Sequence, residues 1–571
     1  MTDKIRIETD RQLLLDAQNS GKSATLAAFF RLSGPGWLQS AITLGGGSLS
    51  GALFLGVLGG VHMLWLQMLA ITFGVIMLSA ISYVTLSTGE RPLQAINRHI
   101  NPALGWGWVI ATVMANIIWC MPQFGLCYES LEQNLAAQQL AGSDTNQKLM
   151  ISVVILIAAF VIVMLNNMPG RWAKVFDWIL KLMVGVVVVC FFGVVLYLTF
   201  QAKLDWSAIF AGFIPDFNQF NQPTGELAEL VGQAPKKFRK FWSDQLVSEQ
   251  RNVLIAAAAT AVGINMTFLL PYSLLSRGWD KTFRGLARFD LLAGLAIPYI
   301  LVTSCVVIAS AYAFHGTVDK SLASQDAVEI QSSSMFSNLQ PILEKRIVSE
   351  HGDAVFDGLD KSEKSARVAE LGAQLDPAEM KLASSLVRRN AFQLSRSLSP
   401  FLGDQTARLI FGIGVFAMGF TTIIILMMIN GFAICEIFGR PDDKWLFAAG
   451  CLIAGIAGTM WPYVWAGESR FWLTILASVF GMMLLPIAYI TFFCMINSRS
   501  LMADEKPSAA KMTIWNILMV PAVLGAILAA GTAIYSRMND SKSITFIITL
   551  AIVYGILVVV GFFVKRTGKQ T

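Results

Sequence analysis

Charged residues are scarce in this chain: Asp, Glu, Lys and Arg together make up 14% of its 571 residues, whereas hydrophobic residues make up 55%. The mean hydropathy is +0.59. An ordinary soluble protein could not keep so much apolar surface away from water. The basic residues are scattered over short loops rather than gathered on one domain, which argues against nucleic acid as a partner. The composition predicts an all-α polytopic membrane protein with lipid around it.

Residues that carry redox, metal or proton chemistry are also few. The seven cysteines lie in or near apolar segments and form no CxxC pair, which argues against a disulfide scaffold or a structural zinc site. The four histidines lie at span ends or in loops, so no imidazole is available as a proton relay at mid-membrane. No nucleophile–base pair, metal cluster or complete phosphate-binding loop appears. We therefore expect no enzyme activity and no bound cofactor apart from a coupling ion.

Twelve apolar runs are long enough to cross a hydrocarbon core of roughly 30 Å. They begin near residues 34, 61, 104, 148, 173, 252, 287, 404, 443, 468, 513 and 544. An even number of spans places both termini on one side, and the short loops of that side hold most of the basic residues. The sequence thus predicts a multi-pass protein of the inner or plasma membrane with both termini in the cytoplasm.

The polar segments divide the chain. Residues 1–33 lack the apolar core of a signal peptide and are expected to remain as a cytoplasmic segment of the mature protein. The other predicted regions are spans one to seven at 34–314 with an outer loop at 201–251, a polar helical insertion at 315–403, spans eight to twelve at 404–564, and a cytoplasmic tail at 565–571.

The insertion contains one clear helix start. Asp376 precedes Pro377, Ala378 and Glu379, so Asp376 is expected to accept from free backbone amides while Glu379 reaches back toward the cap. The insertion is either a small helical cap or a solvated loop with no part in transport.

The first span is interrupted by small residues. The run from Gly34 to Val57 carries three glycines and a serine, Gly45 to Ser48, at mid-depth. An open backbone is tolerated in hydrocarbon only where it lines a cavity or is covered by protein, so these residues indicate a broken helix around a small ligand.

The sixth span has a similar interruption. It carries Gly263, Asn265, Thr267 and Pro271 in mid-membrane. Interrupted first and sixth spans are typical of a 5+5 inverted repeat with its ligand site at the midplane, and spans eleven and twelve then lie outside the repeat.

Several short motifs support this fold. The segment from Gly34 to Leu38, the turn from Thr88 to Glu90, the eighth-span glycines around Phe411 to Gly414, and the polar run from Asn497 to Met502 resemble, in order and spacing, the Nramp family of divalent-metal transporters. That resemblance implies a LeuT-type fold of the APC superfamily and a transporter that works by alternating access.

The family's metal-binding residues are replaced in this chain. Counted from the start of span one, the family's DPGN motif falls on Gly45, Gly46, Gly47 and Ser48; counted from Gly263, its Met-Pro-His falls on Thr267, Phe268 and Leu269; its tenth-span glutamine falls on Leu484. A transition metal prefers thioether, imidazole or carboxylate ligands, and magnesium prefers carboxylates with water. None is expected at these positions.

Bare glycine amides at the start of a half-helix favour an anion or a zwitterion instead. The predicted substrate site comprises Gly45, Gly46, Gly47, Ser48, Thr43, Gly263, Asn265, Thr267 and Gln123, and Gln39, Ser40 and Asn116 are further hydrogen-bonding candidates. Each polar side chain has an alternative role in packing helix against helix.

The coupling ion is expected to be sodium, because Thr421 and Thr422 are adjacent hydroxyls in span eight that can join the first-span carbonyls of Thr43 and Leu44. A proton, carried by Glu129, Glu132 or Asp290, is the alternative. For the whole protein, the alternatives to an anion transporter are a divalent-metal transporter with remodelled ligands and a receptor or scaffold that does not transport.

Overall fold

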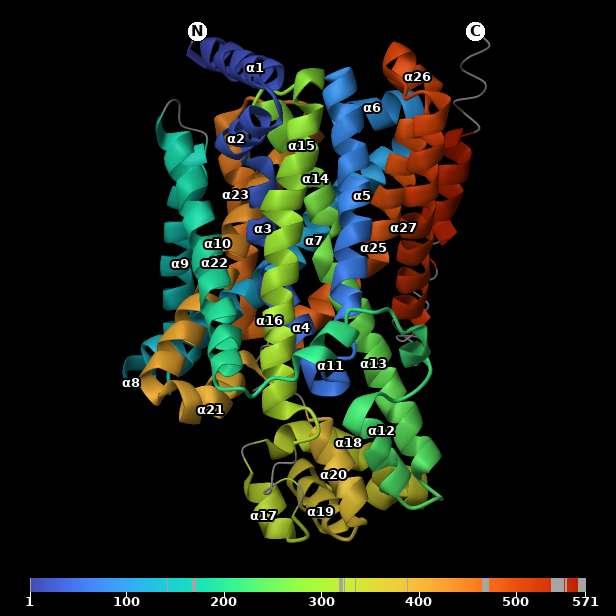
Figure 1. The fold of residues 1–571 in the computed structure, drawn as a ribbon. Helices are drawn as coiled ribbons and strands as arrows, with labels where there is room; N and C mark the ends of the chain where they lie inside the picture. Colours follow the sequence, from blue (N-terminus) through green and yellow to red (C-terminus); the bar gives the residue numbers. More distant parts are fainter. Residues whose placement is uncertain are drawn as a thin grey trace.

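The computed structural model describes residues 2–140, 142–166, 171–317, 322, 324–333, 335–387, 389–464, 472–535, 549 and 552–562. Every regular element in this part of the chain is a helix, as predicted (Figure 1). The long helices run side by side in one bundle, with α1 and α26 (Arg499–Met502) at one end and a group of shorter helices at the other (Figure 1). We call these two ends the N-terminal end and the cap end.

Most predicted spans correspond to long apolar helices. Among the described residues, nine helices have the length and composition to cross a membrane, and one bent pair brings the number to ten. The nine are Trp65–Thr88, Pro102–Leu135, Thr145–Leu165, Lys174–Phe200, Arg239–Ser276, Lys281–Phe314, Asp404–Ile437, Ala477–Asn497 and Ala509–Tyr535. Two other predicted spans coincide with shorter apolar helices, Lys444–Thr459 (α23) and Ile552–Phe562. Twelve spans and an inverted repeat therefore stay predictions, and the predicted tail at 565–571 lies outside the described residues.

Span one is broken as expected, but the break lies at Leu44 and Gly45, and the residues Gly46 to Ser48, also expected in it, form the first turn of the next helix. Its halves are α3 (Pro35–Thr43) and α4 (Gly46–Gly59), and they are bent by 55°. Pro35 suits the first turn of α3 because it lacks an amide proton that would need a partner there. Leu44 and the extended Gly45 form the link. The absence of a side chain at Gly45 lets the link pack closely, since a Cβ there would collide with the hydroxyl of Thr422.

Span six is also interrupted, but a few residues earlier than predicted. α13 (Arg239–Ala261) ends before the extended Val262 and Gly263, and α14 (Ile264–Ser276) begins immediately afterwards. Asn265 and Thr267, expected in the break, lie in the first turns of α14. The Asn265 side chain accepts from the Met266 amide at 2.9 Å, which satisfies one of the free amides at this helix start.

Span seven and the helices beside the breaks complete the centre of the bundle. Span seven consists of α15 (Arg284–Leu291), a π-helical turn at Leu292–Ala296, and α16 (Ile297–Phe314). The other helices used below are α7 (Pro102–Ser130), α10 (Arg171–Phe200), α22 (Asp404–Ile437) and α25 (Trp472–Asn497). α3 and α7 both pack against α14 and α22, so these four helices surround the breaks from the N-terminal side.

The insertion forms a helical cap at the cap end (Figure 1). Its helices are α17 (Ala327–Ser332), α18 (Phe336–His351), α19 (Lys361–Ala373), α20 (Pro377–Ser385) and α21 (Ala391–Leu402). Asp376 accepts from the Ala378 amide at 2.8 Å, which confirms the predicted start of α20. Glu379 does not reach back toward this cap. It is buried and pairs with Arg346 at 2.6 Å, while Trp242 of α13 donates to it at 2.8 Å.

Residues 2–32 form two helices that pack on the N-terminal end. α1 (Thr2–Ser20) and α2 (Lys22–Leu32) lie against each other, and only Ser33 and Gly34 separate α2 from α3. Arg11 forms an ion pair of 2.6 Å with Asp280, in the turn after α14. This segment is therefore tied to the membrane-spanning part rather than extended from it.

Candidate functional site

The two helix breaks meet at the end of α3. Thr43 Oγ1 donates to the backbone carbonyl of Ala261 at 3.3 Å and to Sδ of Met266 at 3.0 Å. The Ser48 hydroxyl of α4 donates to the carbonyl of Thr43 across the break. Thr43, Ser48 and Met266 are all buried. The contact brings the last turn of α3, the start of α4 and the first turn of α14 into one polar site.

The start of α4 is capped by a side chain from α7. Gln123 Oε1 accepts from the amide of Gly46 at 3.0 Å, while Gln123 Nε2 has no hydrogen-bond partner among the described residues. A neutral amide oxygen therefore already satisfies one of the glycine amides that were expected to be bare. This weakens the argument for an anion, because the remaining partial positive charge at this helix start is smaller.

One face of α7 contacts the residues beside both breaks. Trp108 Nε1 donates to Thr267 Oγ1 at 3.0 Å, and the Trp119 ring lies so close to Gly47 that a Cβ there would be 2.9 Å from it. Together with Gln123, these residues recur at the spacing of one helical face. Asn116 lies on the same face, between Trp108 and Trp119. Trp119 was not predicted from the sequence, although its position four residues before Gln123 is a usable signal.

The two threonines of α22 differ in their surroundings. Both hydroxyls donate to carbonyls of their own helix: Thr421 to Ala417 at 2.8 Å and Thr422 to Met418 at 2.8 Å. Thr422 also lies 3.5 Å from the carbonyl of Ala41 and beside Gly45. Of the two threonines, it is therefore Thr422 that reaches span one, and it contacts the carbonyl of Ala41 rather than the predicted carbonyls of Thr43 and Leu44.

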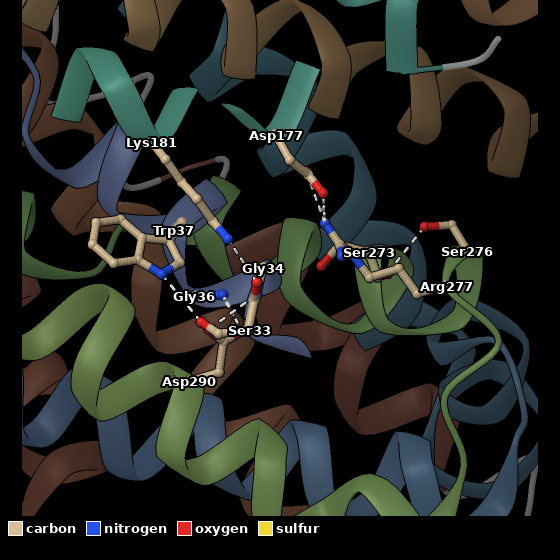
Figure 2. A network of polar contacts seen from close by, with 10 residues as sticks. All are labelled: Ser33, Gly34, Gly36, Trp37, Asp177, Lys181, Ser273, Ser276, Arg277 and Asp290. Atoms are coloured by element: carbon tan, nitrogen blue, oxygen red, sulfur yellow. Dashed lines mark hydrogen bonds and ion pairs between the residues drawn. The ribbon is translucent and has the colours of Figure 1, made fainter. Parts of the chain in front are cut away.

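A charged network holds the N-terminal end of α3 (Figure 2). The carboxylate of Asp290 accepts from the Ser33 hydroxyl and from the amides of Gly34 and Gly36, the last at 2.6 Å. Lys181 donates to the carbonyl of Ser33 at 2.9 Å. Asp290, one of the candidates for carrying a coupling proton, thus caps α3.

Asp177 has a different partner from the one its spacing predicts. Lys174, Asp177 and Lys181 are spaced to meet along one face of α10, but the carboxylate of Asp177 pairs with Arg277 of α14 at 2.8 Å (Figure 2). The guanidinium of Arg277 in turn packs against Gly34, where a Cβ would be 2.5 Å away. The network therefore joins α3, α10, α14 and α15.

No group of three or more His, Cys, Asp or Glu side chains among the described residues is arranged to hold a metal ion. The sulfur atom at the site comes instead from Met266, which the sequence analysis did not select because its count placed the family's methionine one residue later. The potential ligands at the breaks are thus a thioether, hydroxyls, amide oxygens and backbone carbonyls.

Comparison with known proteins is consistent with this architecture. The family model described as natural resistance-associated macrophage protein-like matches residues 36–346 and 378–536. Among solved structures, the Eremococcus coleocola manganese transporter in complex with an aromatic bis-isothiourea substituted compound is similar with a TM-score of 0.61 and 15% identity, over 96% of this chain and 97% of that one. A single-residue mutant of the same transporter gives a TM-score of 0.60 at 15% identity, over 95% and 96%. None of the curated proteins compared with the chain matches it significantly.

Proposed function

Since the chain belongs to the natural resistance-associated macrophage protein-like family, we propose that it is a secondary transporter that moves a divalent metal ion across the membrane by alternating access. Its bundle of apolar helices is that of an integral multi-pass membrane protein. The similar solved structures are manganese transporters, which makes Mn²⁺ the first ion to test.

The observation that carries the proposal is the contact between Thr43 and Met266 at the meeting point of the two breaks. Carbonyl, amide and hydroxyl oxygens with water are ligands for Mn²⁺, and a thioether adds a softer ligand. Met266 therefore offers a thioether beside Thr267, the counted position at which the sequence predicts no metal-binding side chain. The ligand set is uncharged, so we expect weaker binding than at a site with carboxylates, which attract a cation over a longer range.

The anion or zwitterion expected from the sequence has no support in the comparisons. Its physical basis was a set of free glycine amides, and Gln123 occupies the amide of Gly46. The metal ion, which was the alternative, agrees with both the family and the thioether at the break.

The orientation in the membrane and the coupling ion complete the proposal. The basic residues of the loops favour the N-terminal end as the cytoplasmic side. Sodium beside Thr422 is the proposed coupling ion, and a proton is the alternative. Since Asp290 is engaged in capping α3, a proton pathway would rely on Glu129 or Glu132.

Uptake by proteoliposomes tests the function. Liposomes that contain the purified chain and a Mn²⁺-quenched dye should show uptake above protein-free liposomes, and Met266→Leu should slow it. Met427→Leu, at a buried position of α22, is the matched control, because Met and Leu are close in volume and such exchanges usually cost less than about 1.5 kcal/mol. Folded protein that takes up neither Mn²⁺, Cd²⁺ nor Mg²⁺ would contradict the proposal and favour a receptor or scaffold.

A further inference from the structure

Asn116 is a buried amide without a hydrogen-bond partner. Its side chain is fully buried on α7, and neither Oδ1 nor Nδ2 makes a hydrogen bond among the described residues. A buried amide in this state is unfavourable, and native proteins retain such groups where water, an ion or a function requires them. Gln39 of α3, one turn before Thr43, is likewise buried with both amide atoms unpaired.

The position of Asn116 is fixed by its neighbours on α7. It lies two turns, roughly 10 Å along the helix axis, from Gln123, which contacts the start of α4. On the same face, Trp119 packs against Gly47 and Trp108 bonds to Thr267 of α14. Asn116 therefore lies between two residues that contact the two broken spans, on the N-terminal side of the break.

We propose that Asn116 is a cargo-contacting residue that binds the metal ion, with part of its water shell, as the ion passes between the break and the N-terminal end. This inference rests on the proposed function. A bare cation would satisfy only the amide oxygen, whereas a hydrated ion brings bound water that donates to the amide oxygen and outer water that can accept from the amide N–H groups. An amide with both kinds of atom unpaired thus fits a partly hydrated cation better than a dehydrated one.

An amide that only joins helices looks different in this protein. Asn430 of α22 is equally buried and its Oδ1 is likewise unpaired among the described residues, but its Nδ2 donates to the carbonyl of Gly450 in α23 at 2.7 Å. Asn430 therefore has a structural partner of the kind that polar residues in membrane helices commonly find. It provides the matched control for Asn116.

The two amides should respond in opposite ways to removal. Asn116→Leu deletes two unpaired polar atoms, so we expect a melting temperature equal to or above that of the native protein and Mn²⁺ uptake per folded molecule reduced roughly tenfold, as for the loss of a hydrogen bond to a charged group. Asn430→Ala deletes a made hydrogen bond, so its melting temperature should fall. Uptake by Asn116→Leu within about twofold of the native rate would overturn the proposal.

Two further measurements separate this proposal from the proposed function. If Asn116→Leu does not fold, Asn116→Asp, which keeps the side-chain volume, should bind Mn²⁺ roughly tenfold more tightly in calorimetry, and an unchanged affinity would overturn the proposal. Asn116→Cys should react with a small thiol reagent in the full-length protein, above the background of the native cysteines, when the N-terminal end opens. Absence of that reaction would overturn the role of Asn116 even if Mn²⁺ is transported, whereas a reaction without Mn²⁺ uptake would place the failure in the proposed function.

Discussion

Asp290 of α15 accepts a hydrogen bond of 2.6 Å from the backbone amide of Gly36 in α3. The same carboxylate accepts from Gly34, so a charged group of span seven serves as the N-terminal cap of the first half of span one. A negative charge at this position also interacts favourably with the helix dipole of α3. A Cβ at Gly36 would collide with the backbone carbonyl of Asp290, which explains why a glycine occupies this position. Any movement of α3 away from α15 must break these bonds.

Asp290→Asn keeps the shape of the side chain but removes its charge. The amide nitrogen then faces backbone N–H groups that it cannot bond, so we expect a loss of stability of about 1–3 kcal/mol. Thermal unfolding of the full chain in detergent measures the change. Glu370→Gln, in the exposed Arg367–Glu370 pair, is the control and should change stability by less than about 0.5 kcal/mol. Equal melting temperatures for the two variants would contradict the capping role of Asp290.

The Arg11–Asp280 ion pair should link the N-terminal helices to the turn after α14. Both side chains are partly exposed, so a double-mutant cycle with Arg11→Ala and Asp280→Ala should give a coupling of about 0.2–1 kcal/mol that decreases with added salt. Faster hydrogen exchange of the α1 amides in the single variants would show that α1 separates from the turn after α14. A coupling near zero at low salt would show that α1 is held by apolar contacts such as the buried Leu14 instead.

Glu505, in the short turn that follows α26, should make the contact of this turn with Lys281 and Arg284 sensitive to acid. Its hydrogen bonds from Lys281 and Arg284 lower the pKa of Glu505 from its ordinary value of 4.5 to about 2. A carboxyl with a lowered pKa stabilises the folded state fully above its unfolded pKa, and this contribution is lost as the pH falls from about 4.5 to about 2. Hydrogen exchange of residues 499–506 should therefore increase over this range, and Glu505→Gln should remove the dependence. If hydrogen exchange in Glu505→Gln increased over the same pH range, a group other than Glu505 would be responsible.

The proposed sodium site predicts different roles for Thr422 and Thr421. Thr422 lies beside Gly45 and the carbonyl of Ala41, whereas Thr421 donates only within α22. We expect Thr422→Val to reduce the sodium dependence of uptake and Thr421→Val to leave it nearly unchanged, with both proteins folded. If sodium is coupled to the cargo, each must change the other's affinity equally, by a coupling of roughly 1–3 kcal/mol. Uptake that follows a proton gradient and ignores sodium would contradict the prediction.

The helical bundle and the break in span one were accessible from the sequence. Apolar runs report on helices in lipid because every backbone group must find its partner within the same segment. Gly45 to Ser48 signal the break because this much glycine at mid-depth weakens a helix. Both breaks were predicted a few residues too late, since Gly46 to Ser48 in span one and Asn265 and Thr267 in span six are compatible with the first turn of a helix as well as with an interruption.

The partners within the site were not accessible from the sequence. Spacing along a helix reports only on neighbours three or four residues apart, and for Asp177 it favoured the lysines of its own helix. The actual partner, Arg277, is 100 residues away. Gln123 on Gly46 is a contact of the same kind, over 77 residues. Such contacts depend on how the spans pack, which no local pattern encodes.

The bond from Trp242 to Glu379 gives the two broken spans unequal freedom. α13 continues past the apolar segment into the cap, where Trp242 is fully buried and Glu379 is fixed by Arg346. The first half of span six, α13, is thereby fixed to a folded body, while the first half of span one is joined through Ser33 and Gly34 to α1 and α2, which are tied to the bundle by the Arg11–Asp280 ion pair. In the proposed alternating-access cycle, we therefore expect the cap to stay fixed and α3 to move.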